Sequence, residues 1–362
     1  MSRQAPFKIP KITVVDVSAF TQSEQKLQTH ELHNAKQHAA SKLAHACKES
    51  GFFYLSGHNV SEDLQERLES LSKVFFALPE SEKMKIRMEN GGRAWRGYFP
   101  VGSELTSGKP DLKEGIYFGE ELSAHHPLVK AHAPLHGANL FPDNHPKFKD
   151  TVLEYIEAMT RLGHQVTAAL ALSLGLPEDY FFSRYTENPL VLFRIFIYPV
   201  PEKNSENSVA QEQTWGVAEH TDYGFLTLLK QDNTGGLQIK SQGHWIEAPP
   251  FKNTFVCNIG DMLERMTGGL YLSTPHRVRN KGSHDRLSFP FFFDPAFTAR
   301  VKAIEGLAAK YQPDAALSDG TRRAQNERWD KENVHAFEGT YGDYLQSKIA
   351  KVFPRLFAAT EL

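Results

Sequence analysis

Cysteine is scarce in this sequence of 362 residues, which contains only Cys47 and Cys257. Two cysteines are too few for a disulfide framework, and no C-x-x-C spacing marks a zinc or redox site. No apolar run approaches the ~20 residues that a membrane-spanning helix needs, and the N-terminus lacks the pattern of a signal peptide. We therefore expect a protein of the cytoplasm that is neither secreted nor inserted into a membrane.

An excess of charge of either sign is also missing. The 41 basic residues nearly balance the 43 acidic ones, which leaves a formal net charge of -2. No overall field therefore attracts nucleic acid or an anionic membrane. We expect a small-molecule substrate and no nucleic acid, membrane or obligate protein partner.

The first half of the chain alternates short apolar runs with helical patterns. Strands are expected at 12–17, 52–55 and 114–118, and helices at 31–50, after the N-cap residue Ser61, and around 152–170. Residues 91–144 are rich in glycine, proline and histidine, which indicates long loops over a scaffold. The helical residues should pack around a core built elsewhere.

Short β-type runs dominate the sequence after residue 188. They cover residues 191–198, 225–229, 237–240, 245–248, 254–258, 274–279 and 286–293. Such regular spacing is typical of a sandwich or barrel. We predict a mainly β fold with flanking α-helices, in which a double-stranded β-helix (jelly roll) core follows an α-helical N-terminal part.

The domain organisation expected from these patterns is one integrated domain in three segments. Residues 1–185 form the N-terminal helical and loop region, 186–300 the jelly-roll core, and 301–362 a C-terminal loop and helix. The polar stretches 202–214 and 312–338 are expected to be loops. The final amphipathic helix, 344–353, should either close the mouth of the barrel or pack on the N-terminal part.

A candidate metal site begins with His220 and Asp222, which on one strand would point to the same face. His276, at the start of another β-type run, offers a third ligand. Two imidazoles and one carboxylate are typical of oxygen-activating non-haem Fe(II), although zinc is chemically possible. The four histidines of the preceding loop region have no carboxylate at matching spacing and are expected at surface positions: His125, His126, His132 and His136.

A candidate anion site follows at Arg286 and Ser288, two residues apart on one expected strand. A guanidinium group can hold a carboxylate through two hydrogen bonds, and the hydroxyl adds a third. The alternative for Arg286 is a surface ion pair with Asp285 or Asp294.

Several stretches of the sequence resemble one known family. They are HTDYGFLTLL from His220, GGLQI from Gly235, NIGDML from Asn258, STPHRV from Ser273 and DRLSFPFFFDP from Asp285. The N-terminal half adds VVDVSAF, ESGFFYLSGH, FFALP and RGY, so the similarity covers most of the chain. These motifs are similar to the iron/ascorbate oxidoreductase family, the isopenicillin N synthase-like branch of the 2-oxoglutarate/Fe(II) oxygenases.

The resemblance implies a reaction and the residues that support it. Fe(II) would be held by His220, Asp222 and His276, and 2-oxoglutarate by Arg286, Ser288 and Tyr198. Relatives often carry Asn at the position of Phe196, so one polar contact is missing here. With O2, and with ascorbate as reductant, such an enzyme hydroxylates or otherwise oxidises a small organic substrate and releases succinate and CO2. The alternatives are an isopenicillin N synthase-type oxidase that uses no 2-oxoglutarate, and a non-catalytic jelly-roll binding or sensor protein.

Strand parity suggests residues for the substrate. If Tyr198 faces the cavity, Arg194 does so too, and Phe292 likewise shares the side of Ser288. We expect these two side chains to hold the substrate. A bulge at Pro290 would break this parity, and Arg194 would then pair with a buried carboxylate while Phe292 joined the core.

Overall fold

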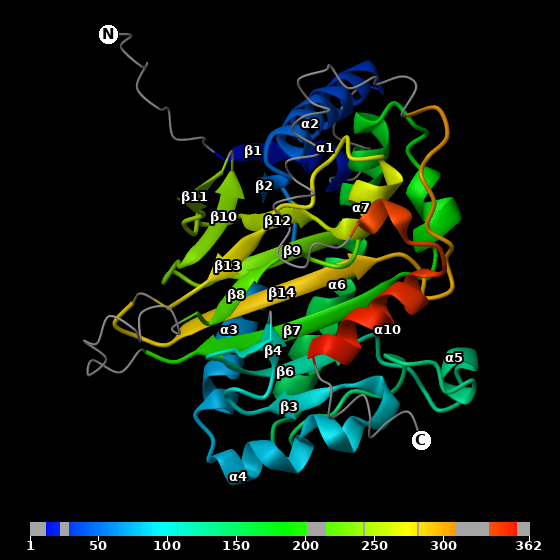
Figure 1. The fold of residues 1–362 in the computed structure, drawn as a ribbon. Helices are drawn as coiled ribbons and strands as arrows, with labels where there is room; N and C mark the ends of the chain where they lie inside the picture. The colour runs from blue at the N-terminus through cyan, green and yellow to red at the C-terminus, as the bar shows by residue number, and fades with distance from the viewer. Residues whose placement is uncertain are drawn as a thin grey trace, which may run out of the picture.

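The computed structural model describes residues 12–21, 29–106, 108–200, 215–241, 243–280, 282–307 and 333–352. In these residues a large sheet of eight strands has the order β1-β2-β12-β9-β14-β7-β6-β3, and a smaller sheet has the order β11-β10-β13-β8. Helices flank the large sheet, with α6 behind it and α10 in front of it (Figure 1). The predicted mainly β fold with a jelly-roll core is confirmed.

The strands of the two main sheets have the following bounds. The large sheet contains β1 Thr13–Asp16, β2 Phe52–Ser56, β3 Gly97–Phe99, β6 Glu114–Gly119, β7 Leu190–Tyr198, β9 Leu226–Gln231, β12 Phe255–Ile259 and β14 Arg286–Asp294. The small sheet contains β8 Val217–His220, β10 Leu237–Ser241, β11 His244–Glu247 and β13 His276–Val278. A short hairpin joins β4 Leu105–Thr106 to β5 Lys109–Pro110.

The helices lie mainly in the N-terminal half. They are α1 Ser18–Thr21, α2 Thr29–Glu49, α3 Glu62–Phe76, α4 Glu80–Lys83, α5 Pro127–Lys130, α6 Pro146–Ser173, α7 Asp261–Met266 and α10 Tyr341–Val352, with shorter turns at η2 Met84–Ile86, η3 Met88–Ala94, η4 Phe182–Thr186 and η6 Val334–Ala336. Ser61 caps α3 as predicted, because its side chain accepts a hydrogen bond from Leu64 N. The predicted loop 202–214, and 312–332 of the second predicted loop, lie outside the described residues.

Alternation along β7 and β14 separates the core from the cavity. Phe193 and Phe293 face α6, where the Phe193 ring packs 5.0 Å from that of Tyr155. At the contact between α6 and β14, a Cβ on Gly163 would lie 2.2 Å from the Phe293 ring, so only glycine allows this close approach. The side chains that alternate with Phe193 on β7 and with Phe293 on β14 point to the other side of the sheet, where a cavity lies.

Strands from the N-terminal region pair directly with strands of the core. β2 pairs with β12, and β6 pairs with β7, so residues before 186 extend the same eight-stranded sheet. This arrangement supports our proposal that residues 1–185 and 186–300 belong to one integrated domain.

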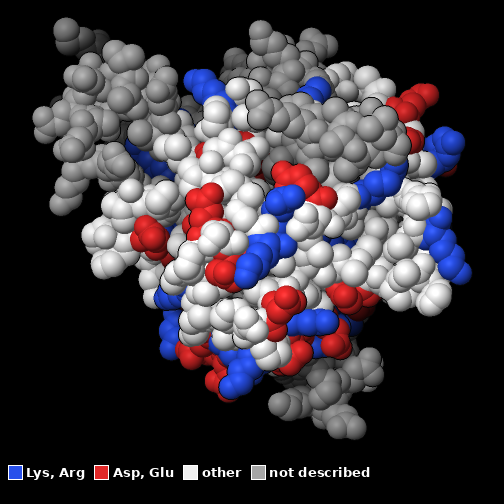
Figure 2. Space-filling view, turned by 90° about the horizontal axis from the view of Figure 1, so that it is seen from below, with Lys and Arg blue, Asp and Glu red and all other residues white. Residues whose placement is uncertain are grey.

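The described surface carries mixed charge. Figure 2 shows basic and acidic side chains interspersed on the face seen from below. No helix among the described residues combines the length and apolar character needed to cross a membrane.

Candidate active site

Two histidines from neighbouring strands and one aspartate meet in the cavity. His276 on β13 lies directly opposite His220 on β8, and their ring centroids are 4.2 Å apart. Asp222 Oδ1 lies 3.9 Å from His220 Nε2 and 3.7 Å from His276 Nε2. All three ligand atoms lie within 4.8 Å of one another, a spacing at which they could hold one metal ion.

The expectation that His220 and Asp222 share a strand is wrong, since β8 ends at His220. Asp222 lies in the following turn, which α7 holds through its first residues: Asp261 N donates to Asp222 O at 2.8 Å, and Met262 N donates to Gly224 O at 2.9 Å. The turn also receives support from Asp294, whose Oδ1 accepts a hydrogen bond from Phe225 N. Tertiary contacts, rather than strand pleat, therefore bring the carboxylate to the histidines.

The hydrogen bonds around the triad leave one ligand atom free on each residue. His220 Nδ1 lies 2.8 Å from Ala218 O and His276 Nδ1 lies 3.1 Å from Thr274 O, so each Nε2 faces the cavity. Asp222 Oδ2 accepts hydrogen bonds from Asn258 Nδ2 and Thr227 Oγ1, which leaves Oδ1 for a metal. Such outer contacts orient metal ligands.

Sequence reasoning did not assign roles to Thr227 and Asn258. Thr227 stands in the motif HTDYGFLTLL and Asn258 begins the motif NIGDML. Their place in these motifs was the available signal for a role at the site.

The protonation states of His220 and Asp222 also suit a metal. Burial and the neighbouring charge of His276 lower the pKa of His220 to about 3, so its imidazole is neutral at pH 7. Burial alone would raise the pKa of Asp222, but His276, His220 and two hydrogen bonds hold it below its usual value. A neutral imidazole and an ionised carboxylate are the forms that bind a metal.

Arg286 is completely buried, with 0% of its surface exposed, and it is not among the residues that line the cavity, although Ser288 on the same strand is. It lies opposite Tyr198 in the pairing of β14 with β7, and its Cζ is 4.9 Å from the Tyr198 ring centroid. Nε donates to Gly235 O and Nη2 to Gln231 Oε1, whereas Nη1 has no hydrogen-bond partner among the described residues. The alternative interpretation of Arg286 as a surface ion pair is therefore wrong, because the side chain is buried. Its Nη1 remains as a buried donor that a ligand could use.

Ser288 and Tyr198 line the same cavity as the triad. The pairing of β14 with β7 keeps one register from Arg286 to Asp294, so no bulge occurs at Pro290. The predicted parity therefore holds for both strands, and Arg194 and Phe292 also line the cavity.

The guanidinium group of Arg194 lies between two aromatic rings. Its Cζ is 4.1 Å from the ring centroid of Tyr117, its cross-strand neighbour on β6, and 4.8 Å from that of Phe292. The buried carboxylate of the alternative interpretation is also present, because Glu104 Oε1 lies 3.8 Å from Arg194 Nη1. At that distance the pair is an ion pair without a hydrogen bond.

A second charged group lies behind Arg194 and was not predicted. Lys113 Nζ lies 2.9 Å from Glu104 Oε2 and close to Asp111, and all three residues are buried. Tyr117 donates a hydrogen bond to Glu104 Oε1 at 2.7 Å. The Gly- and Pro-rich texture of this region indicated loops, and no spacing in it signalled an ion-pair network.

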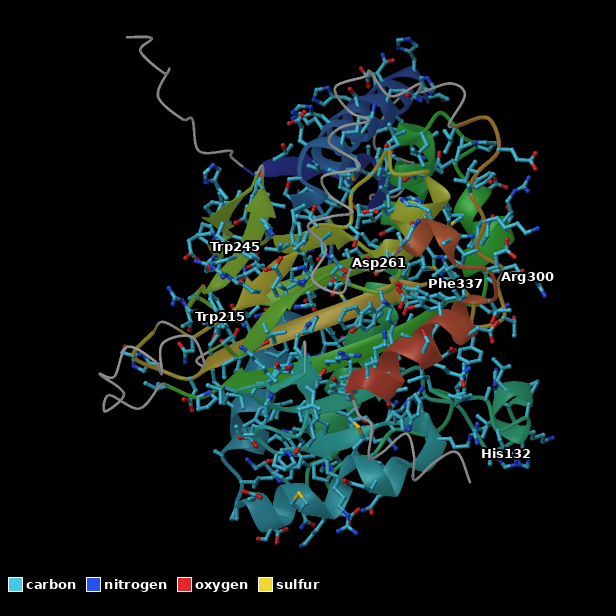
Figure 3. The ribbon with its side chains drawn as sticks, in the orientation of Figure 1. His132, Trp215, Trp245, Asp261, Arg300 and Phe337 are labelled. Atoms are coloured by element: carbon cyan, nitrogen blue, oxygen red, sulfur yellow. The ribbon has the colours of Figure 1, made fainter. Side chains whose placement is uncertain are left out.

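The C-terminal helix α10 forms part of the cavity wall through Tyr341, Leu345, Ile349 and Val352. Tyr341 donates to Asp294 Oδ2, and Tyr344 donates to Asp261 Oδ2 at 2.8 Å. Asp261 and Phe337, labelled in Figure 3, lie beside this helix, and the Phe337 ring packs 5.1 Å from Tyr344. The helix therefore contacts both the barrel and the start of α7.

Comparisons with known proteins agree with this geometry. Residues 12–144 match the family model described as the N-terminal region of the non-haem dioxygenase in morphine synthesis. Residues 179–295 match the family model of the 2OG-Fe(II) oxygenase superfamily. A probable iron/ascorbate oxidoreductase of Dictyostelium discoideum is 49% identical over 365 residues, covering 96% of each chain. The chain belongs to the 2OG-Fe(II) oxygenase superfamily.

Other proteins are similar over nearly the whole chain. The 1-aminocyclopropane-1-carboxylate oxidase of Dictyostelium discoideum is 39% identical over 377 residues, covering 96% of each chain. A full-length Neurospora crassa protein, crystallised in complex with alpha-KG, has a TM-score of 0.71 and 27% identity, over 94% of this chain and 96% of that one.

As a 2OG-Fe(II) oxygenase, the protein uses Fe(II) and 2-oxoglutarate to oxidise a small organic substrate. Family membership favours this activity over the two alternatives considered above, an oxidase that uses no 2-oxoglutarate and a non-catalytic sensor. Within the described residues, the triad of His220, Asp222 and His276 is the group with metal-ligand spacing, and the four loop histidines are not part of it.

Proposed function

We propose that this oxygenase hydroxylates a small substrate bearing a carboxylate, with His220, Asp222 and His276 as the iron ligands. The observation that carries the proposal is a single cavity lined by this triad, by the 2-oxoglutarate candidates Tyr198 and Ser288, and by Arg194. Fe(II), when bound, activates O2 and couples decarboxylation of 2-oxoglutarate to oxidation of the substrate.

The residues present fit a ferrous ion. Two imidazole nitrogens and one carboxylate oxygen leave further coordination positions open, as oxygen-activating Fe(II) sites require. The hydrogen bonds from Asn258 and Thr227 fix Asp222, and burial keeps the His220 imidazole neutral in the absence of metal. The protein thus holds the ligands in place before the ion arrives.

Arg286 would hold the distal carboxylate of 2-oxoglutarate. Its Nη1 is the unpaired donor, and Ser288 and Tyr198 offer hydroxyl groups on the same face of the sheet. Phe196, where relatives often carry Asn, adds no polar contact, and its ring instead lies 4.6 Å from Lys113 Nζ. Burial strengthens each charged hydrogen bond made at this end of the cavity.

Arg194 and Phe292 would hold the substrate. Stacking between Tyr117 and Phe292 fixes the guanidinium plane, so its donors are oriented before the substrate binds. The apolar remainder of the cavity, which includes Leu345 and Ile349 of α10, would take the hydrocarbon part and exclude water.

We also propose that the protein acts in the cytoplasm. Its two cysteines are buried free thiols, which suits a reducing compartment.

The test is coupled turnover of the purified protein. With Fe(II), 2-oxoglutarate, ascorbate, O2 and a panel of small carboxylic and amino acids, one substrate should raise succinate formation above the uncoupled rate. Asp222→Ala should abolish both rates, whereas Asp285→Ala, a change at a carboxylate outside the cavity lining, should leave them unchanged. Absence of any 2-oxoglutarate decarboxylation by iron-loaded protein would disprove the proposal.

A further inference from the structure

Two buried polar atoms of opposite charge lack hydrogen-bond partners at the substrate end of the cavity. Arg194 Nε donates no hydrogen bond, and Glu104 Oε2 accepts none, among the residues that the structure describes. Glu104 is 5% exposed, and Lys113 Nζ lies 2.9 Å from its Oε2 as an ion-pair partner. Buried groups in native proteins are nearly always paired, so each such atom needs an explanation.

The two atoms belong to Arg194 and Glu104, whose side chains lie close together but form no hydrogen bond with each other. Glu104 Oε1 lies 3.8 Å from Arg194 Nη1, which is too far for a hydrogen bond. The aromatic rings of Tyr117 and Phe292 hold the guanidinium group, while the Tyr117 hydroxyl and Lys113 hold the carboxylate. Neither side chain is therefore positioned to satisfy the other.

The charges of this cluster favour a ligand with both signs. Burial alone would raise the pKa of Glu104, but Lys113 and Arg194 lower it below its usual value, so the carboxylate is ionised. Lys113 is shared between Glu104 and Asp111, so two buried carboxylates face one ammonium group. A ligand that brings only an anion to Arg194 would place a second negative charge beside Glu104, which is unfavourable in a buried site.

We propose that Glu104 and Arg194 together recognise an α-amino acid, Arg194 binding its carboxylate and Glu104 its ammonium group. This inference rests on the proposed function and narrows its substrate class from carboxylates to zwitterions. An α-ammonium group lies two bonds from the carboxylate carbon, so one compact end of the substrate reaches both side chains. The rest of the substrate extends along the aromatic and aliphatic wall toward the metal triad.

Two matched sets of probes separate the contributions of the two charges. The first set is 1-aminocyclopropane-1-carboxylate, cyclopropanecarboxylate without the amine and cyclopropylamine without the carboxylate. The second is L-leucine, isocaproate and isopentylamine, and the remaining proteinogenic L-amino acids complete the panel. Succinate formation above the uncoupled rate, and binding measured by calorimetry without O2, report on each probe with the iron- and 2-oxoglutarate-loaded protein.

We expect at least one amino acid to bind and to stimulate succinate formation at least tenfold more efficiently than its deaminated partner. Glu104→Gln keeps an acceptor for Tyr117 but removes the charge, and it should reduce this preference to less than threefold. The matched control Glu69→Gln changes a carboxylate that is ion-paired with Lys230 and does not line the cavity, and it should keep the preference.

Contrary results have distinct meanings. If Glu104→Gln weakens amino acid and deaminated acid equally, Glu104 only positions Arg194 and the inference is wrong. It is also wrong if only deaminated acids bind, or if uncoupled decarboxylation proceeds and no amino acid binds. An unchanged apparent constant for 2-oxoglutarate shows that the variant is folded. If the wild-type protein did not decarboxylate 2-oxoglutarate at all, the proposed function itself would instead be wrong.

Discussion

Asn258 donates its side-chain amide to Asp222 Oδ2 at 2.7 Å, and this contact turns Oδ1 toward His220 and His276. This orientation supports the proposal that Asp222 binds the metal through one oxygen. Asn258 has no place in the triad, yet it determines which way the aspartate points.

Asn258→Ala should weaken Fe(II) binding by about 10–100-fold, as loss of an outer-shell hydrogen bond typically does. Anaerobic titration of metal-free protein with Fe(II) measures the affinity. Asn34→Ala, a change on the exposed side of α2, serves as control. Unaltered affinity in the Asn258 variant would show that Thr227 alone orients Asp222.

Arg286→Ala should raise the apparent constant for 2-oxoglutarate at least tenfold. Removing a buried charged partner of a carboxylate costs about 2–5 kcal/mol. The measurement is the rate of succinate formation as a function of 2-oxoglutarate concentration, with Arg161→Ala on the exposed face of α6 as control. A constant that stays at the wild-type value would remove Arg286 from the cosubstrate site.

Arg194→Ala should lower substrate oxidation at least tenfold while substrate-independent decarboxylation of 2-oxoglutarate persists. The side chain stacks on Tyr117 and Phe292, away from the cosubstrate candidates, so the two activities should separate. Product and succinate are measured in the same reaction. A parallel fall in both, with loss of folded protein, would make Arg194 a structural residue.

Truncation before Gly339 should lower the ratio of oxidised substrate to succinate. The shortened protein loses the cavity wall formed by Tyr341, Leu345 and Ile349, so water reaches the site. Tyr341→Phe, which removes only the hydrogen bond to Asp294, should cause a smaller loss, and Gln346→Ala, at a residue of α10 that does not line the cavity, should cause none. Full coupling in the truncated protein would contradict a closing role for the helix.

Asp294 should make stability depend on pH. Burial raises its pKa from 3.8 to about 7, so the native state keeps a proton that the unfolded chain has lost in this interval. The resulting stabilisation is complete below pH 3.8 and is lost as the pH rises through about 7, by up to about 4 kcal/mol. Urea unfolding of metal-free protein across this range tests the slope, which Asp294→Asn should flatten. An unchanged slope in that variant would assign the titration to another group.

The fold was largely predictable because alternation and turn residues are local signals. The continuous register of β7 with β14 carried the predicted parity from Tyr198 to Arg194 and from Ser288 to Phe292. Pro290 causes no bulge: the pairs of Phe289 and Pro290 with β7 are missing, but the same register resumes at Phe291, and Pro290 stays opposite Leu229 of β9.

The parts that sequence reasoning missed depend on contacts between distant segments. Asp222 reaches the histidines through a turn held by α7, not through the pleat of a strand. Glu104 and Lys113 flank a hairpin in a loop-like region, and only the packing of β6 on β7 brings them to Arg194. The periodicity of the sequence within one helix or strand contains no information about contacts between distant segments.

The carboxylate of Asp294 accepts hydrogen bonds from two separate parts of the molecule, Phe225 N beside the ligand turn and Tyr341 OH on α10. Displacement of either segment would therefore remove one of the two hydrogen bonds that this carboxylate accepts. Linkage is reciprocal: if docking of α10 increases affinity for the metal by some factor, the metal must favour docking by the same factor. Undocking of the C-terminal helix would thus remove a hydrogen bond from the same carboxylate that supports the turn of Asp222.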